Sequence, residues 1–154
     1  MTIFEINHRV LFLDFDGVLH PLSPDLIMDS NLPLSELIAV HDFFRWVPLL
    51  ADILRDHADV RIVVHSTWRL LATDAELRVA LGPLTERFAG STPRGPRWES
   101  IAWVITQNRL RNFRILDDSA EDFPPALPEL ILCDENEGIA DALVQTRIRE
   151  WLTS

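Results

Sequence analysis

Short, mostly apolar runs recur along the chain and are separated by longer stretches with helical periodicity. Runs of this kind are typical of strands that are buried on both faces of a parallel sheet. They predict strands over residues 9–14, 60–64, 113–116 and 130–133, and a weaker pattern predicts a further strand at 88–90.

The stretches between the runs predict helices over residues 48–57, 73–81, 98–107 and 138–152. The first helix could begin earlier, within residues 34–46, and the pattern leaves its start open. The second opens on a capping box formed by Thr73 and Glu76. Because strands alternate with helices, the fold class is predicted to be α/β, a three-layer, Rossmann-like parallel sheet with helices on both faces.

A single domain covering residues 1–154 is expected, since the chain has no internal repeat, low-complexity tract or linker. Residues 20–33 (HPLSPDLIMDSNLP) contain three prolines and predict an irregular loop, which could form a small flap. The early sequence lacks a secretory pattern, and no apolar stretch reaches the length of a membrane span. We therefore expect a cytoplasmic protein that does not associate with membranes.

Charge is distributed unevenly along the chain. The net charge is −10, all 14 basic side chains are arginines, and Cys133 is the only cysteine. Residues 117–150 hold ten acids and two arginines, whereas residues 87–114 hold six arginines and one glutamate. An acidic protein is poorly suited to extended binding of duplex nucleic acid, which requires many phosphate contacts. A local group of arginines can still bind one phosphate through bidentate contacts.

Three of the predicted strands end in short polar side chains. These are Asp14 and Asp16, Ser66 and Thr67, and Asp117 and Asp118. Parallel strands share one carboxyl edge, so the three groups should meet there. Residues i and i+2 of an extended backbone point the same way, and Gly17 then allows a sharp turn. Carboxylates that can attack phosphorus, with hydroxyl and arginine donors, predict phosphoryl transfer with Mg²⁺ as cofactor.

The motifs LDFDGVL, VVHSTWR and ILDDSAED stand in an order that resembles the haloacid dehalogenase (HAD) superfamily of aspartate-dependent phosphohydrolases. The resemblance covers nearly the whole chain. It implies that Asp14 is the nucleophile and that Asp16 is the general acid/base. It also implies metal ligation by Asp14, by the backbone carbonyl of Asp16 and by Asp118, with Asp117 and Asp122 in support.

The same resemblance assigns the phosphate-binding groups. Ser66 is the expected hydroxyl, with Thr67 as the alternative. The third motif of the superfamily normally supplies a lysine, but this chain contains none, so the cation must be an arginine. Arg97 fits best because it precedes a predicted helix, and Arg94 is the alternative.

The segments DGVLHP and STWR are most similar to the HAD domains of Swiss Army Knife RNA-repair proteins, which are related to polynucleotide phosphatases. This implies Mg²⁺-dependent hydrolysis of a phosphomonoester through an aspartyl-phosphate, with a nucleotide or a polynucleotide end among the candidate substrates. Too few residues separate Asp14 from Ser66 for both a helix and a separate cap domain. In the superfamily, enzymes without a cap have an open cleft and often act on large substrates.

Other interpretations stay open. A catalytically silent HAD-like binding or regulatory domain would keep the same acids, whereas a response-regulator receiver would carry its acidic pair early and an essential lysine late. The acids, Ser66 and Arg97 could also serve as turn caps or surface groups. His20, His65, Trp68 and Arg69 flank the predicted site, and the sequence does not assign them a role.

Overall fold

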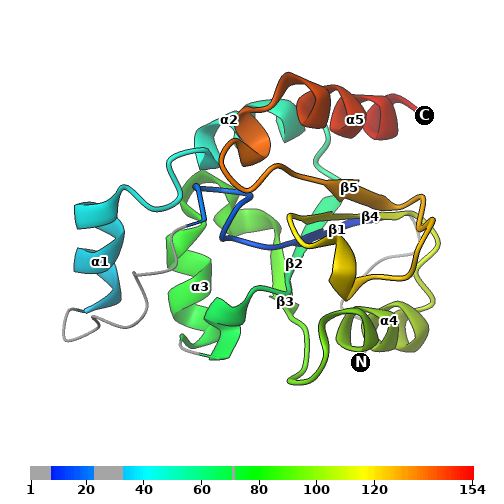
Figure 1. Cartoon of the computed structure of the whole chain (residues 1–154), viewed down its shortest axis with the longest axis horizontal. Helices are drawn as coiled ribbons and strands as arrows, with labels where there is room; N and C mark the ends of the chain where they lie inside the picture. Colours follow the sequence, from blue (N-terminus) through cyan, green and yellow to red (C-terminus); the bar gives the residue numbers. More distant parts are fainter. Residues whose placement is uncertain (1–7, 23–32, 71) are drawn as a thin grey trace.

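Five parallel strands form one sheet at the centre of the molecule (Figure 1). The structure is a computed structural model, and it describes residues 8–22, 33–70 and 72–154. The sheet order is β3-β2-β1-β4-β5. The strands are β1 (Arg9–Leu13), β2 (Val60–Val64), β3 (Phe88–Ser91), β4 (Phe113–Asp117) and β5 (Leu130–Leu132). This arrangement confirms the predicted α/β class, and β3 confirms the weakest of the predicted strands.

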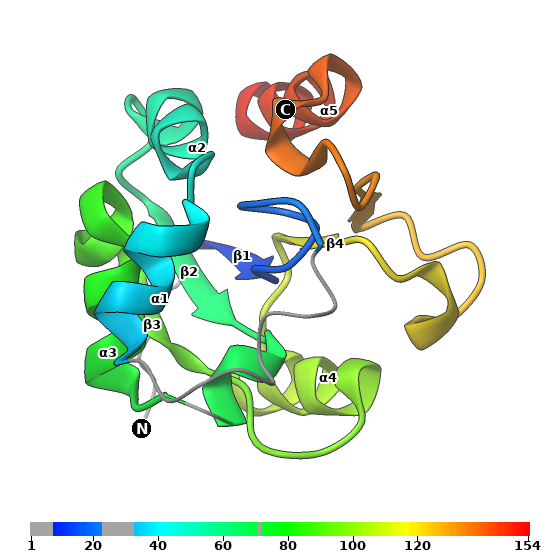
Figure 2. The same ribbon diagram turned by 60° about the vertical axis from the view of Figure 1, so that its left-hand side comes forward.

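Helices cover both faces of this sheet. They are α1 (Leu34–His41), α2 (Val47–Leu54), α3 (Asp74–Ala80), α4 (Arg97–Asn108) and α5 (Ala142–Thr153). Figure 2 shows α2 and α5 on one side of the sheet and α4 on the other. The larger part of the core lies between the sheet and α2, α3 and α5, and a smaller part lies under α4.

The central strand β1 shows why these residues form a sandwiched sheet. Its side chains from Val10 to Leu13 are all fully buried. Successive side chains of a strand point to opposite faces. Leu11 and Leu13 therefore pack toward α2 and α5, whereas Val10 and Phe12 pack toward α4. A strand with two buried faces needs no polar alternation, which is why its sequence is a continuous apolar run.

The helix boundaries differ from the prediction in three places, the first being the end of α2, which lies at Leu54 and not at residue 57. The segment 34–57 forms two helices, because Asp42 and Phe44 take positive φ angles of 52° and 64° and interrupt the helical path. Near the C-terminus, Gly138–Ala140 forms a separate 3₁₀ turn, and Asp141 caps α5 by accepting the Leu143 amide. The closing helix therefore begins at Ala142.

The predicted flap of residues 20–33 lies mostly outside the described residues, which resume at residue 33. Between β1 and β2, the described part of the chain forms α1 and α2. Within the described ranges, no helix is both long and apolar enough to cross a membrane.

Candidate active site

The polar residues predicted to meet at one edge do lie at the carboxyl ends of neighbouring strands. Leu13 of β1 is in register with Val64 of β2 and with Leu116 of β4. The residues that follow these three positions are Asp14, His65 and Asp117. Asp14 therefore lies between His65 and Asp117 at the edge of the sheet. The strand order also changes direction between β1 and β4, and open α/β sheets bind ligands at such a switch point.

Asp14, Asp117 and Asp118 form a carboxylate cluster at this switch point. Each offers an oxygen, and the three oxygens lie within 4.8 Å of one another. Asp14 is only 3% exposed and Asp117 is fully buried. Burial, together with the charges of Asp117 and Asp118, holds the pKa of Asp14 well above its usual range. Burial and the charge of Asp117 raise the pKa of Asp118 to about 6. The cluster is thus electrostatically strained when it holds no cation.

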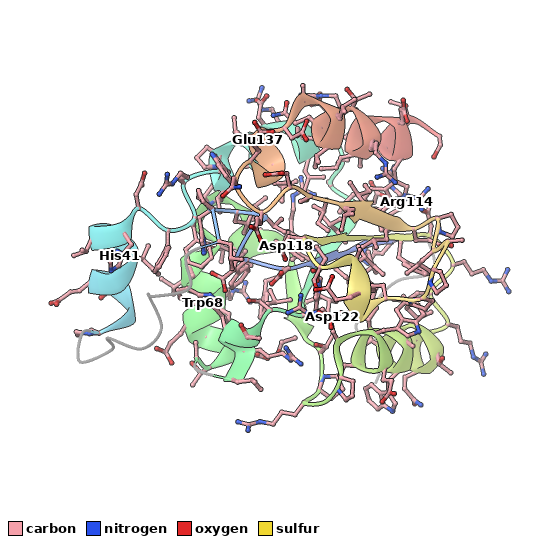
Figure 3. All side chains as sticks on the ribbon, viewed as in Figure 1. His41, Trp68, Arg114, Asp118, Asp122 and Glu137 are labelled. Atoms are coloured by element: carbon pink, nitrogen blue, oxygen red, sulfur yellow. The ribbon has the colours of Figure 1, made fainter. Side chains whose placement is uncertain are left out.

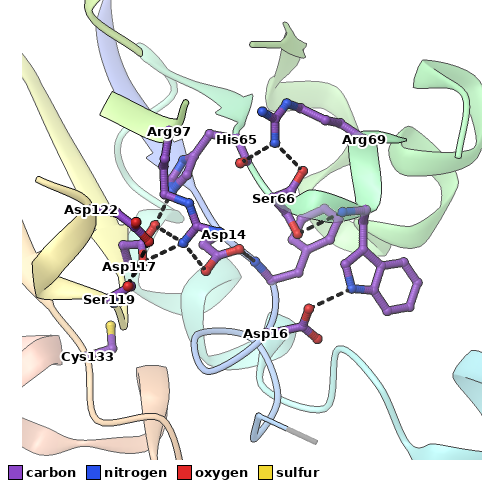
Figure 4. Close-up of polar contacts among 12 residues, drawn as sticks. Asp14, Asp16, His65, Ser66, Arg69, Arg97, Asp117, Ser119, Asp122 and Cys133 are labelled. Carbon is purple, nitrogen blue, oxygen red and sulfur yellow. Dashed lines mark hydrogen bonds and ion pairs between the residues drawn. The ribbon is translucent and has the colours of Figure 1, made fainter. Parts of the chain in front are cut away.

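Arg97 provides the nearby positive charge. It is the first residue of α4, and one guanidinium nitrogen donates to both oxygens of Asp117 at 2.9 Å (Figure 4). The same nitrogen lies 3.4 Å from Asp14 Oδ2. Burial lowers the pKa of Arg97, but the carboxylates of Asp14 and Asp117 outweigh this effect and raise it overall. Of the two predicted arginines, Arg97 thus contacts the cluster, whereas the Arg94 side chain is exposed on the preceding loop.

Asp117 has more partners than a simple metal ligand would need. His65 Nε2 contacts its Oδ2 at 2.7 Å, and the Ser119 amide donates to its Oδ1 at 2.9 Å. Burial would raise the pKa of Asp117, but the hydrogen bond from His65 and the charge of Arg97 lower it overall. Burial also lowers the pKa of His65. A neutral His65 therefore donates to an ionised Asp117, which is fixed in place at the base of the cluster.

Asp118 lies against the turn that follows β1. Gly17 has a φ of +75°, and a Cβ atom there would overlap the Asp118 carboxyl group. Only glycine adopts this backbone conformation without strain while leaving room for the neighbour. Glycine at position 17 therefore allows the positive φ of the turn and leaves space for the Asp118 carboxyl group. These two requirements explain why a glycine follows Asp16.

Ser66 is fully buried at the end of β2, whereas Thr67 is exposed. Ser66 Oγ accepts a hydrogen bond from the Trp68 amide at 3.2 Å, at the start of the 3₁₀ turn η1 (Thr67–Leu70). The contact matches turn capping, the alternative to the predicted phosphate-binding role of Ser66. It uses a lone pair of Oγ and leaves the hydroxyl proton to donate, so capping and phosphate binding are compatible.

Asp16 lies outside the carboxylate cluster and is held by two donors. His20 Nε2 contacts Oδ1 at 2.7 Å, and Trp68 Nε1 donates to Oδ2 at 3.1 Å. His20 is fully buried, and 19% of the Asp16 side chain is exposed. The sequence placed His20 and Trp68 near the site, but it did not indicate that both would contact the same carboxylate.

Arg69 joins two of the loops around the site. It donates to the carbonyls of His65 and Ser66, both at 2.9 Å, and to the Gly95 carbonyl at 3.3 Å. Burial lowers the pKa of Arg69, and the nearby charge of Arg97 adds to this effect. Arg69 thereby ties the end of β2 to the loop that precedes Arg97.

Three buried polar atoms near the ends of β2 and β3 have no hydrogen-bond partner among the described residues. They are His65 Nδ1, Arg69 Nε and Thr92 Oγ1. Thr92 immediately follows β3, and its amide donates to the Val64 carbonyl at 2.9 Å. Thr92 was not among the residues predicted from the sequence, although a hydroxyl after the weak strand at 88–90 was the available signal.

Asp122 lies apart from the cluster. It is exposed, and its Oδ2 accepts the hydroxyl of Ser119 at 2.7 Å. Figure 3 shows Asp118 and Asp122 on the segment that follows β4. The negative charge of Asp122 helps to raise the pKa of Arg97. Asp122 therefore interacts with the site electrostatically, through Arg97, and not by contact with the three carboxylates.

The residues present fit a hard divalent cation. Mg²⁺ prefers carboxylate, carbonyl and water oxygens, and it usually binds one or two carboxylates together with substrate phosphate. The repulsion within a group of three acids, two of them buried and two with raised pKa values, would be relieved by such a charge. Arg97 neutralises only part of the negative charge of the three carboxylates, and a bound cation would balance the remainder.

Comparison with known proteins gives one family. No curated protein and no solved structure matches the chain significantly. The family model of the HAD domain in Swiss Army Knife RNA repair proteins matches residues 10–144, which include the carboxylate cluster, Ser66 and Arg97. Because the match covers most of the sequence, the chain belongs to this family of HAD domains.

Proposed function

We propose that the protein is a Mg²⁺-dependent phosphohydrolase that acts on a phosphomonoester through an aspartyl-phosphate on Asp14. Membership of the HAD family indicates phosphohydrolase-type chemistry in general. The observation that carries the finer proposal is the position of Asp14. It is a buried carboxylate at the switch point, 3.4 Å from Arg97 and within 4.8 Å of two further acids.

In the first step, a carboxylate oxygen of Asp14 attacks phosphorus in line with the ester bond. The new bond joins this oxygen to phosphorus, and the bond from phosphorus to the ester oxygen breaks. Asp16 gives its proton to the departing oxygen, which leaves as an alcohol. The Phe15 amide donates to Asp14 Oδ1 at 2.8 Å, so the orientation of the nucleophile is fixed.

In the second step, Asp16 takes a proton from water, and the resulting hydroxide attacks the aspartyl-phosphate. The bond between phosphorus and Asp14 breaks, which releases inorganic phosphate and restores both carboxyl groups. Arg97 and the hydroxyl of Ser66 donate to phosphate oxygens in both steps. The contacts of Arg97 with Asp14 and Asp117 use one guanidinium nitrogen, so its other N–H groups can donate to the phosphate.

The cation would be held by Asp14, Asp118 and the backbone carbonyl of Asp16, with Asp117 orienting the group. When bound, Mg²⁺ would reduce the repulsion between an anionic nucleophile and an anionic ester. The substrate is proposed to be a phosphomonoester, and nucleotides and polynucleotide ends are the first candidates. The short insertion between β1 and β2 favours an open site that admits a large substrate.

The test compares phosphate release from p-nitrophenyl phosphate, a nucleoside monophosphate and oligonucleotides phosphorylated at either end, each with and without Mg²⁺. Asp14→Asn should lose at least 10³-fold in kcat because it removes the nucleophile. Asp56→Asn is the matched control, since Asp56 is an exposed aspartate just after α2.

Two results would contradict the proposal. Retained turnover in Asp14→Asn would exclude the aspartyl-phosphate. Binding of Mg²⁺ by the wild-type protein, without turnover of any of these esters, would favour a catalytically silent binding domain instead.

A further inference from the structure

Two buried donors hold the carboxylate of Asp16, and each contacts a different oxygen. His20 Nε2 lies 2.7 Å from Oδ1, and Trp68 Nε1 lies 3.1 Å from Oδ2. His20 lies four positions after Asp16 in the turn that follows β1, whereas Trp68 lies 52 positions from Asp16, after β2. A carboxylate with one donor on each oxygen has a fixed orientation.

The proton positions on His20 follow from its second contact. The Phe44 amide donates to His20 Nδ1 at 3.1 Å, so Nδ1 must carry a lone pair. A neutral imidazole has its proton on the other nitrogen. Nε2 therefore carries the hydrogen, and His20 donates it to Asp16. The Phe44 amide thus sets the tautomer that makes His20 a donor.

Phe44, whose amide makes this contact, has an unusual backbone conformation. Its φ of 64° lies in the left-handed region, which bulky residues rarely adopt. Strained residues persist where the surrounding packing determines them, and they cluster at functional sites. The Phe44 ring packs edge-on against Phe15, with centroids 4.8 Å apart, and against His20 and Trp68. The strain therefore lies at the residue whose amide orients His20.

We propose that His20 and Trp68 are positioning residues that hold the carboxylate of Asp16 for proton transfer. The proposal deepens the proposed function and rests on it. Proton donation to a leaving group requires a fixed distance and direction. The aromatic rings around His20 and Trp68 keep both donors in place. They belong to Phe15, Phe43 and Phe44.

The kinetic test uses two substrates whose leaving groups differ. An aryl ester such as p-nitrophenyl phosphate releases a stable phenolate and needs little proton donation, whereas an alkyl ester such as glycerol phosphate needs it. The parameter compared is kcat/KM, which covers the cycle only as far as release of the leaving group and so isolates the first step.

Trp68→Phe keeps an aromatic ring and removes only the N–H donor. It should lower kcat/KM for the alkyl ester about tenfold and for the aryl ester less than threefold, with Asp16→Asn giving a larger gap of the same kind. For His20, Gln still presents a donor near Nε2 and should retain more alkyl-ester activity than Leu.

Trp151→Phe is the matched control. Trp151 is also a buried tryptophan, and its Nε1 donates to Asn112 Oδ1 at 2.6 Å, in a contact that involves none of the site residues. It should leave the ratio of the two kcat/KM values unchanged.

Equal losses on both esters in Trp68→Phe would overturn the proposal, since they would show a packing effect alone. If the wild-type protein hydrolyses no ester, the proposed function fails, and nitrogen NMR still tests the contacts. The proposal predicts a proton on His20 Nε2 and none on Nδ1, and a shifted Trp68 indole signal in Asp16→Asn. The opposite tautomer, or an unmoved indole signal, would overturn it.

Discussion

Asp118 packs against Gly17 so closely that a side chain at position 17 would overlap its carboxyl group. The contact joins the turn after β1 to the end of β4, the two strand ends that supply the carboxylate cluster. The absence of a side chain at position 17 thus allows a distant acid to lie against the turn.

Gly17→Ala is expected to displace Asp118 and to weaken Mg²⁺ binding at least tenfold. It should also lower the free energy of unfolding by about 2 kcal/mol, because alanine is strained at positive φ and also meets the carboxyl group. Denaturant unfolding and calorimetric titration with Mg²⁺ measure the two effects.

Gly82→Ala is the matched control. Gly82 has a φ of +53°, but a Cβ there would meet nothing within 4 Å. It should cost only the backbone strain and leave Mg²⁺ binding unchanged. Equal Mg²⁺ affinity in the wild type and Gly17→Ala would show that the contact does not position the cluster.

The carboxylate cluster should make the metal-free protein less stable as the pH rises. The pKa of Asp118 is raised to about 6 in the folded state, above its ordinary 3.8. The folded state therefore binds this proton more tightly than the unfolded state does, and the associated stability is lost as pH rises from about 4 through 6.

Asp118→Asn removes the charge and should raise the free energy of unfolding at pH 7 in metal-free buffer by about 1 kcal/mol, because Asp118 is only half-buried and solvent screening reduces the effect; at pH 4 the change should be small. Adding Mg²⁺ should raise the melting temperature of the wild type more than that of the variant. A variant that is less stable than the wild type at pH 7 would contradict this electrostatic description.

Arg97 should contribute to both stability and substrate binding. Arg97→Met leaves Asp14 and Asp117 without their contacting cation, and the loss of one partner from a buried ion pair costs roughly 3 kcal/mol. KM for a phosphomonoester should rise at least tenfold. Urea unfolding and steady-state kinetics measure these changes, and Arg97→Lys should restore part of the activity.

Arg94→Met decides between the two arginines that the sequence proposed. The Arg94 side chain is exposed, so the change should leave stability within 0.5 kcal/mol or so of the wild type. A larger rise in KM for Arg94→Met than for Arg97→Met would assign the phosphate-binding role to Arg94.

An ion pair near the start of β1 should make the free energy of unfolding depend on pH in the opposite direction. Arg9 Nε lies 2.6 Å from Asp59 Oδ2, and this hydrogen bond lowers the pKa of Asp59. The contribution of a depressed acid is present above its ordinary pKa and is lost as the pH falls through the folded value. Because 37% of the Asp59 side chain is exposed, solvent screening limits its size.

Asp59→Asn should lower the free energy of unfolding at pH 7 by about 0.5–1 kcal/mol. The difference from the wild type should shrink below pH 3.8 or so, while activity stays unchanged. Unfolding curves across this pH range measure the effect. A difference that grows as the pH falls would show that the ion pair is not its source.

The strands and the location of the site could be predicted because both depend on local pattern. Val10–Leu13 is apolar throughout because both faces of β1 are buried, and the acids follow at its carboxyl end, where open α/β sheets bind ligands. Helix ends were less predictable. The break between α1 and α2 depends on positive φ at Asp42 and Phe44; aspartate adopts this conformation more often than most residues, but phenylalanine rarely does, so the sequence did not indicate the break.

The sequence by itself determined the α/β class, the shared carboxyl edge and the acids that gather there, since parallel strands bring their ends together whatever the details of packing. Only the tertiary structure decided which side chains touch. It placed Arg97 rather than Arg94 on Asp14 and Asp117, and it brought Trp68 onto Asp16. Contacts between residues so far apart in the chain depend on helix placement and on aromatic packing, which no local pattern encodes.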